Sequence, residues 1–97
     1  MRLRYTLPAL ADLTSILDYI ADRSAPGATR IDTRIRAVAD LLLRYPLAGA
    51  VTDDPTIRRI TTTPYPYHIF YEATDAEIII HAVRHGARDP LHNVRSE

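Results

Sequence analysis

The last third of the chain constrains the fold most, because it holds three short runs rich in β-branched and aromatic residues. Polar segments separate these runs, which cover residues 57–63, 67–72 and 78–83. In the second run, Tyr67, Ile69 and Tyr71 fall on one face, as expected for a strand that buries one side. The third run is apolar on both faces except at His81, which indicates a central strand covered on both faces. The pattern predicts three consecutive β-strands.

Two amphipathic helices are predicted before these strands. Thr6 supplies a hydroxyl cap and Pro8 fits a first helical turn, and Ser24 with Pro26 repeats this start signal. After each start, apolar residues recur at three- and four-residue spacing. They are Leu10, Leu13, Leu17 and Ile20 on the first helix, and Ile31, Ile35, Val38, Leu42 and Tyr45 on the second. Pro46 ends the second pattern, because proline cannot continue helical hydrogen bonding.

The order of the predicted elements defines a fold class. Residues 2–5 alternate between polar and apolar, as in a short half-buried strand. The link between the helices is short, so the helices should form an antiparallel hairpin. Residues 47–55 have the composition of a loop. The sequence therefore predicts one α+β domain over residues 1–97, with the helical hairpin covering one face of a mostly antiparallel sheet.

The charged residues restrict the chemistry that is open to this chain. All twelve basic residues are arginines. Any cationic site must therefore use guanidinium groups, which stay charged and bind carboxylates or phosphates in a fork geometry. The formal net charge is +0, which argues against non-specific nucleic-acid binding as the main activity, because that activity usually shows as a basic excess.

Several site classes and locations are also excluded by composition. The chain has no cysteine, and its four histidines show no metal-ligand spacing, so we expect neither a metal nor another cofactor. No run approaches the roughly 20 apolar residues of a membrane span. The N-terminus lacks the long apolar run of a signal peptide. We expect a soluble, cytoplasmic protein.

A dense polar cluster follows the third predicted strand. It contains Arg84, His85, Arg88 and Asp89 around Gly86. Because glycine suits a tight turn, one interpretation is that the cluster only terminates the strand. In the other interpretation, two arginines and a histidine beside a turn form a polar recognition site. The residues alone leave both interpretations open.

Three further groups of polar residues also have a structural interpretation beside a functional one. Arg58 can pair with an acidic residue such as Glu77 or Asp89 and fix the sheet, or it can belong to a functional site. His81 lies on an apolar strand, so we interpret it as a satisfied core histidine rather than a ligand. The arginines of the second helix are interpreted most simply as its solvated face.

Local motifs occur in a fixed order along the chain. They are Asp12-Leu13 with Ile16 and Tyr19-Ile20, Tyr45-Pro46-Leu47-Ala48-Gly49, Ile57-Arg58, Tyr67-His68-Ile69-Phe70-Tyr71, and Val83-Arg84-His85-Gly86-Ala87-Arg88-Asp89-Pro90. These motifs and the order of elements resemble the RelE/ParE toxin superfamily of bacterial type II toxin–antitoxin systems. The last motif resembles the ending of the ParE-like, plasmid-stabilisation branch. The resemblance covers nearly the whole chain and implies the fold of that superfamily.

The resemblance leaves two activities to choose between. RelE-like members cleave ribosome-bound mRNA, and ParE-like members inhibit DNA gyrase. RNA cleavage through the 2′-hydroxyl needs a proton acceptor, charge stabilisation at phosphorus and a proton donor. Arg58, Arg84 and Arg88 could stabilise phosphate, and His85 could exchange protons near neutral pH. Residue types alone therefore leave a ribonuclease open as the alternative.

The ParE-like activity matches the sequence better. RelE-like enzymes use basic residues on the middle strands and often a terminal tyrosine or histidine, whereas this chain has no lysine and no tyrosine after Arg88. The resemblance thus implies a gyrase inhibitor that acts by binding rather than by catalysis. The candidate residues for toxicity or target binding are Arg58, Arg84, His85, Arg88 and Asp89.

The resemblance also implies a protein partner. A cognate ParD-like antitoxin would place an acidic C-terminal segment on this chain, and the two would form a hetero-oligomer. We expect the segment to cross the helical hairpin, where the candidate contact residues are Leu13, Leu17, Tyr19, Ile20, Arg34 and Ile35. No direct binding of DNA by this chain is expected. A third interpretation is a degenerate toxin fold that is kept only as an antitoxin-binding module.

Overall fold

A computed structural model describes residues 1–86 of the chain, and it contains the predicted strand, helical hairpin and strand-rich end in that order. The helices and strands are β1 (Arg2–Tyr5), α1 (Leu7–Ala21), α2 (Ala25–Leu41), β2 (Ala50–Val51), β3 (Arg58–Thr61), β4 (Tyr67–Ala73) and β5 (Glu77–His85). The α+β fold class is confirmed. No helix within residues 1–86 combines the length and the hydropathy that a membrane span requires.

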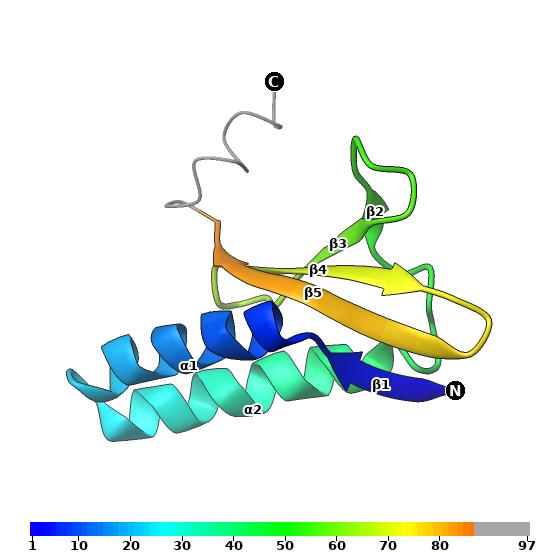
Figure 1. Cartoon of the computed structure of the whole chain (residues 1–97). Helices are drawn as coiled ribbons and strands as arrows, with labels where there is room; N and C mark the ends of the chain where they lie inside the picture. The colour runs from blue at the N-terminus through cyan, green and yellow to red at the C-terminus, as the bar shows by residue number, and fades with distance from the viewer. Residues whose placement is uncertain (87–97) are drawn as a thin grey trace.

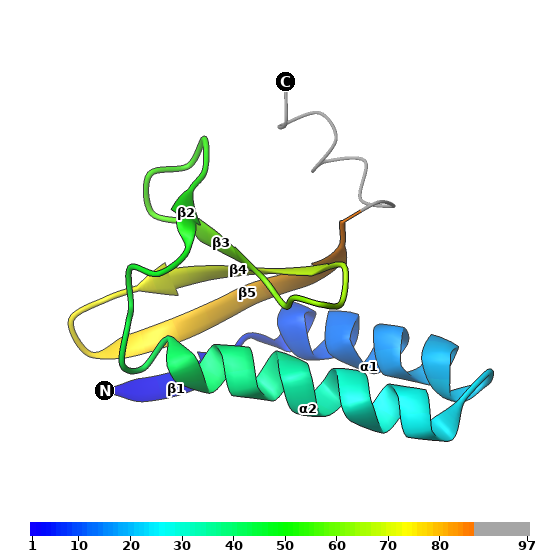
Figure 2. The ribbon, with the colours of Figure 1, turned by 180° about the vertical axis from the view of Figure 1, so that it is seen from behind.

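The five strands form one sheet in the order β1-β5-β4-β3-β2. Strands β2 to β5 pair in antiparallel fashion, whereas β1 pairs in parallel with β5. The first and last strands are therefore neighbours, and the helical hairpin lies between them in sequence. Figures 1 and 2 show both helices on one face of this sheet, so the domain has two layers.

Both predicted helix starts are confirmed by capping hydrogen bonds. The Thr6 hydroxyl accepts the Ala9 amide at 3.2 Å, and the Ser24 hydroxyl accepts the Gly27 amide at 3.0 Å. Each cap satisfies one of the amides that a helix leaves without an internal partner. Only a short turn separates the two helices, which therefore pack as the expected antiparallel hairpin.

The core lies between the hairpin and the sheet. Its fully or almost fully buried members are Ala9, Leu13, Ile35, Val38, Ala39, Leu42, Ile69, Tyr71, Ile78, Ile80 and Val83. Two predicted members of the helical stripes are not in it, because Leu10 is 42% exposed and Tyr45 is 59% exposed. Ala9 takes the inward position on α1. The second helix ends at Leu41, earlier than Pro46 suggested, so Tyr45 lies beyond it.

Two other expectations need correction. Residues 47–55 were expected to be only a loop, but Ala50–Val51 form the edge strand β2 by pairing with β3. Strand β5 is central, as predicted, but the helices cover only one of its faces. The second face of β5 is apolar at Ile79. This residue lies on the side of the sheet away from the helices, next to Glu72, and is still only 7% exposed.

Candidate functional site

The C-terminal half of β5 has a free edge that α1 closes. Strand β1 ends at Tyr5, opposite Ile80, so the rest of β5 has a strand only on its β4 side. Asp12 on α1 fills this position, because its Oδ2 accepts the Val83 amide at 3.1 Å and lies 3.6 Å from Arg84 Nε. Arg84 is therefore paired within the chain, but its side chain stays 46% exposed.

His85 lies at the rim between the sheet and α1. Its register partner is Tyr67, and the two rings meet edge to face with centroids 5.3 Å apart. A cavity of about 230 Å³ opens beside them, and α1 contributes Ser15, Ile16 and Tyr19 to its lining. The structure thus brings His85, predicted for toxicity, beside Tyr19, predicted for antitoxin binding. Arg88 and Asp89 lie outside the described residues.

Arg58 stands at the opposite end of the sheet and holds a loop in place. Its Nη1 donates to the carbonyl of Gly49 at 2.7 Å and to that of Leu47 at 3.4 Å. The expected partner Glu77 instead forms an ion pair with Arg4 at 3.1 Å. Arg58 therefore does stabilise the fold, as the structural interpretation expected, but its partners are loop carbonyls rather than the Glu77 carboxylate.

Tyr71 completes the network around Arg58. Its buried hydroxyl donates to the Pro46 carbonyl at 2.8 Å and accepts the Gly49 amide at 2.8 Å. A Cβ on Gly49 would lie 2.7 Å from the Tyr71 ring and 2.9 Å from the Arg59 carbonyl, so only glycine allows this close approach. Burial raises the pKa of Tyr71, although the Gly49 amide and the Arg58 charge act in the opposite direction.

Polar pairs lie on the sheet face opposite the helices. His81 Nε2 lies 3.0 Å from a Glu72 oxygen, and His68 Nδ1 lies 3.1 Å from the Thr61 hydroxyl. His81 was interpreted as a core histidine; it is satisfied, but its side chain is 38% exposed on this outer face. The error follows from the expectation that both faces of this strand are covered, because the helices cover only one face and His81 alternates onto the other.

The register separates the predicted nuclease residues that the structure describes. Arg58 is opposite Tyr71 on the helical face, whereas Arg84 is opposite His68 on the outer face. Three residues along β4 and two strand spacings separate them, or roughly 14 Å between their Cα atoms. His85 lies near Arg84 in sequence but points to the helical face beside Tyr67. The fold therefore does not gather these three side chains around one phosphate.

The predicted antitoxin contacts divide into buried and accessible residues. Leu13 is 3% exposed and Ile35 is 0% exposed, so both belong to the chain's own core and offer no surface to a partner. Sequence periodicity selected them because it cannot distinguish the inward face of a helix from a face that binds. Tyr19 and Arg34 are exposed, and Leu17 and Ile20 are partly buried.

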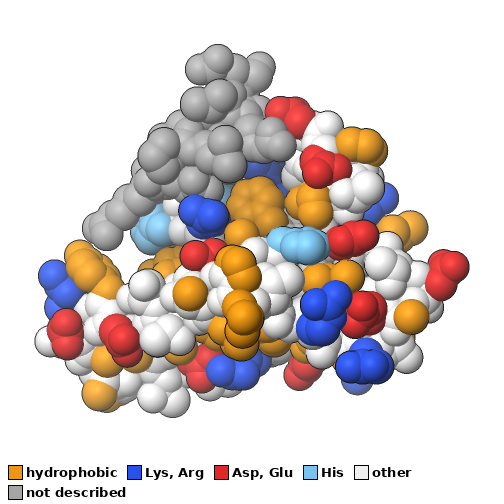
Figure 3. Space-filling model, in the orientation of Figure 1, with side chains coloured by type: hydrophobic (Ala, Val, Ile, Leu, Met, Phe, Trp, Pro, Cys, Tyr) orange, Lys and Arg blue, Asp and Glu red, His pale blue; other side chains and the backbone are white. Residues whose placement is uncertain are grey.

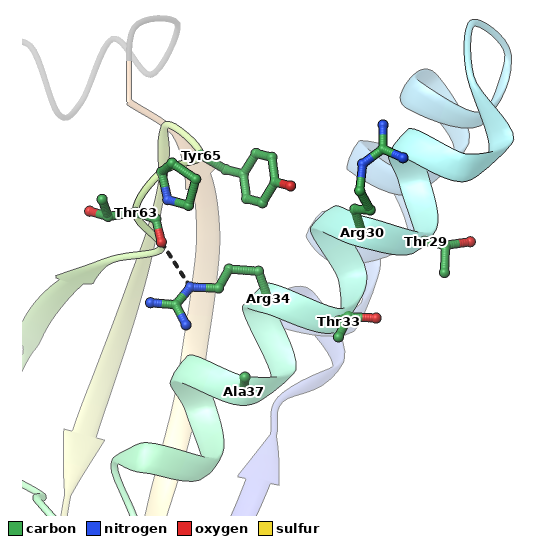
Figure 4. A pocket seen from close by; sticks show the side chains of 8 residues that line it. Thr29, Arg30, Thr33, Arg34, Ala37, Thr63 and Tyr65 are labelled. Carbon is green, nitrogen blue, oxygen red and sulfur yellow. Dashed lines mark hydrogen bonds between the residues drawn. The ribbon is translucent and has the colours of Figure 1, made fainter.

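A groove along α2 was missed in the sequence. It has a volume of about 600 Å³ and separates the outer side of α2 from the β3–β4 loop (Figure 4). We name it the α2 groove, and the residues that define it are Arg30, Arg34, Ala37, Thr63, Pro64 and Tyr65. The spacing of Arg30 and Arg34 by four residues was a signal that could have indicated a shared helix face. The loop across from them could not have been foreseen.

The chain matches a known protein family over almost its whole length. Residues 3–90 match the family described as the ParE toxin of the type II toxin–antitoxin system parDE. The chain belongs to the ParE toxin family. The match covers both helices and every strand, so the assignment applies to the whole domain and not to one motif.

One individual relative of this ParE-family toxin carries a RelE name, although the family itself is described as ParE. "Toxin RelE2" of Caulobacter vibrioides is 40% identical over 84 residues, which are 87% of this chain and 93% of the relative. "Putative toxin Y4kP" of Sinorhizobium fredii is 34% identical and matches 80% of this chain and 82% of its own length. The names do not separate the two activities.

A solved structure supports the same assignment. A chain from the structure titled "Chromosomal ParDE TA system from P. aeruginosa" aligns with a TM-score of 0.75 at 25% sequence identity. The alignment covers 88% of this ParE-family toxin and 95% of that chain. The predicted superfamily and its fold are therefore confirmed.

Proposed function

We propose that this ParE-family toxin inhibits DNA gyrase by binding it and that a cognate, ParD-like antitoxin neutralises it. The observation that carries the choice of target is the separation of the basic residues. Arg58 donates to loop carbonyls and Arg84 pairs with Asp12. An RNA-cleaving site needs groups that converge on one phosphate and one 2′-hydroxyl. Cations that the fold already uses, on opposite faces, suit a binding protein better than a nuclease.

The target-binding residues that we propose lie at the rim where α1 meets the end of β5. Arg84 keeps an exposed guanidinium, and His85 lines the small cavity beside Tyr19. A rim of this kind joins aromatic surface to a cation, a combination that is enriched where proteins bind one another. Arg58 is left out of this set, because its guanidinium is engaged with the Gly49 carbonyl.

The decisive experiment compares two activities of the same purified toxin. Supercoiling by gyrase should be inhibited, and ribosome-bound mRNA should remain intact in a translation-coupled cleavage assay. Intact supercoiling together with cleaved mRNA would establish the RelE-like alternative instead. Silence in both assays, with antitoxin binding retained, would favour a degenerate toxin fold that serves only as an antitoxin-binding module.

The rim itself is tested with His85→Ala. This change removes the ring that packs on Tyr67 and lines the cavity, so we expect inhibition of gyrase to weaken about tenfold, as for a moderate interface residue. Arg36→Ala is the matched control, because Arg36 pairs with Asp32 on α2 and does not line the cavity. Equal inhibition by the His85 variant and the wild type, with the fold verified by circular dichroism, would remove His85 from the site.

A further inference from the structure

Arg30 and Arg34 differ from Arg36 on the same helix. Arg36 forms an ion pair with Asp32 at 2.8 Å, one turn earlier on α2. Within residues 1–86, no carboxylate forms such a pair with Arg30 or Arg34. Arg30 and Arg34 are also four residues apart, where like charges on a helix repel each other. This repulsion costs the isolated chain stability, and no carboxylate of residues 1–86 pairs with either arginine to offset it.

The α2 groove arranges two of these cations around a hollow. Arg34 crosses from the helix to the opposite loop, where its Nε donates to the Thr63 carbonyl at 2.8 Å. This bond orients the guanidinium and leaves its two terminal nitrogens for another acceptor. Figure 4 shows the Tyr65 ring projecting from the loop toward the helix, on the same side as Arg30. The hollow thus combines two forked donors with an aromatic wall.

A second hollow continues the groove toward the end of α2. It has a volume of about 300 Å³, and Ala37 lines both hollows. Leu41, which is 43% exposed, supplies apolar surface here, while Asp40 and Arg44 offset each other in charge. The continuous surface is therefore cationic at the Arg30–Arg34 end and apolar in its middle. The groove therefore suits a segment that places acidic side chains at the Arg30–Arg34 end and an apolar side chain in the middle.

We propose that the α2 groove holds an acidic, extended segment of the antitoxin, with carboxylates on Arg30 and Arg34 and an apolar side chain over Ala37 and Leu41. The proposal rests on the proposed function only in that the partner is an antitoxin. Guanidinium groups bind carboxylates with two parallel hydrogen bonds, and such charge-assisted pairs are strong. A nucleic-acid backbone fits less well, because Asp40 and the apolar middle would oppose a continuous line of phosphates.

The length of the groove sets the length of the segment. Arg30 and Leu41 are eleven positions apart on one helix, which is about 16 Å at the helical rise. An extended chain covers that distance with about five residues at roughly 3.3 Å each. The motif expected in the partner is therefore short: two acidic residues and a large apolar one within about five residues, in either order.

The test measures the affinity of the cognate antitoxin for variants of this toxin by titration calorimetry. Arg30→Ala/Arg34→Ala should weaken binding about a hundredfold, because two charge-assisted contacts are lost. The wild-type affinity should also fall with added salt more steeply than that of the double variant, because salt screens the ion pairs that only the wild type can form. Arg36→Ala is the control on the same helix and should stay within about threefold of the wild type.

Two further variants keep the test valid if the double variant is unstable. Arg30→Ala alone breaks no hydrogen bond or ion pair within residues 1–86 and should weaken binding about tenfold. Ala37→Trp fills the shared floor of the two hollows from an exposed position and should also reduce binding. Wild-type affinity in all of these folded variants would overturn the proposal.

The outcomes separate this proposal from the choice of target. Tight antitoxin binding that does not depend on Arg30 or Arg34 would contradict the groove and leave the gyrase proposal standing. Arginine-dependent antitoxin binding by a toxin that leaves supercoiling intact would support the groove and contradict the target. No antitoxin binding by the wild type would overturn both the partner and the groove.

Discussion

The arginines of the sheet and the arginines of α2 are used differently by this domain. On the sheet, Arg4 pairs with Glu77, Arg84 pairs with Asp12, and Arg58 donates to the carbonyl of Gly49. On α2, Arg30 and Arg34 line a groove with no carboxylate paired to them among the described residues. The sheet cations are engaged by carboxylates or loop carbonyls of the domain. On α2, Arg34 uses only its Nε, which donates to the Thr63 carbonyl, so its terminal nitrogens and Arg30 remain available for a partner.

This difference is the opposite of what the sequence motifs suggested for the two groups of arginines. Arg58 and Arg84 belong to recognisable motifs, so they attracted a functional interpretation, while the arginines of the second helix were interpreted mainly as a solvated face. Figure 3 shows basic and acidic side chains interspersed on one face of the molecule, as expected where charges are largely matched. For the choice of binding residues, an arginine without a carboxylate partner is therefore more informative in this domain than an arginine that belongs to a sequence motif.

Among the arginine variants, Arg58→Ala should lose the most stability. The substitution removes donors to the carbonyls of Gly49 and Leu47, beside the buried Tyr71 hydroxyl. A hydrogen bond from a charged group contributes about 1.5–3 kcal/mol to stability, so the free energy of unfolding should fall by about 2 kcal/mol. Urea denaturation monitored by circular dichroism measures the change.

Arg30→Ala is the matched control for this prediction. Arg30 is exposed and its side chain makes no hydrogen bond or ion pair within residues 1–86, so the free energy of unfolding should change by no more than about 0.5 kcal/mol. If the two variants lost stability equally, the contrast between the sheet and the helix arginines would be wrong.

A second prediction concerns alkaline pH and the network around Arg58. Burial raises the pKa of Tyr71, and it also raises that of the half-buried Tyr5. A raised pKa means that the folded state holds the phenol proton longer than the unfolded state. Stability from these groups is therefore complete below about pH 10, the ordinary value of tyrosine, and is lost as pH rises through the folded pKa.

Two variants sharpen the alkaline test. Tyr71→Phe should reduce the slope of stability against pH above about pH 10, because one titrating group is gone. Arg58→Ala should steepen it, since the Arg58 charge works against the burial that raises the pKa of Tyr71. A pH profile that is the same in all three proteins would show that the hydroxyl does not titrate with unfolding.

The sequence predicted the architecture because that information is local. Capping residues at Thr6 and Ser24, and the alternation of Tyr67, Ile69 and Tyr71, each follow from the chemistry of a few neighbouring residues. The edge strand β2 was missed, because two residues carry no periodic pattern and depend on β3 to pair. His81 was misplaced because an apolar run does not reveal that only one face of β5 is covered by the helices.

The candidate site was predicted less well, because its contacts join residues that are distant in sequence. The partners of Arg58 are carbonyls, which no side-chain pattern reveals. Asp12 was noticed only as part of a motif, yet its carboxylate closes the edge of β5 at Val83. Periodicity placed Leu13 and Ile35 on the correct helix stripes but could not say that these stripes face the core.

A smaller loss of stability than for Arg58→Ala is predicted for Arg84→Ala, and this variant distinguishes a structural from a functional role at the rim. The pair with Asp12 is long at 3.6 Å and its Arg84 side chain is 46% exposed, so the loss of unfolding free energy should be at most about 1 kcal/mol. The Val83 amide keeps its own bond to Asp12, which limits the damage. Inhibition of gyrase should nevertheless weaken clearly, because the exposed part of the guanidinium is lost.

Asp12→Asn provides the counterpart to Arg84→Ala. The amide oxygen can still accept the Val83 amide, but the negative charge that restrains Arg84 is gone. Stability should change little, and Arg84 should become more available, so inhibition of gyrase should be equal to or stronger than that of the wild type. A parallel loss of inhibition in both variants would mean that the ion pair itself, and not the free guanidinium, shapes the rim for its target.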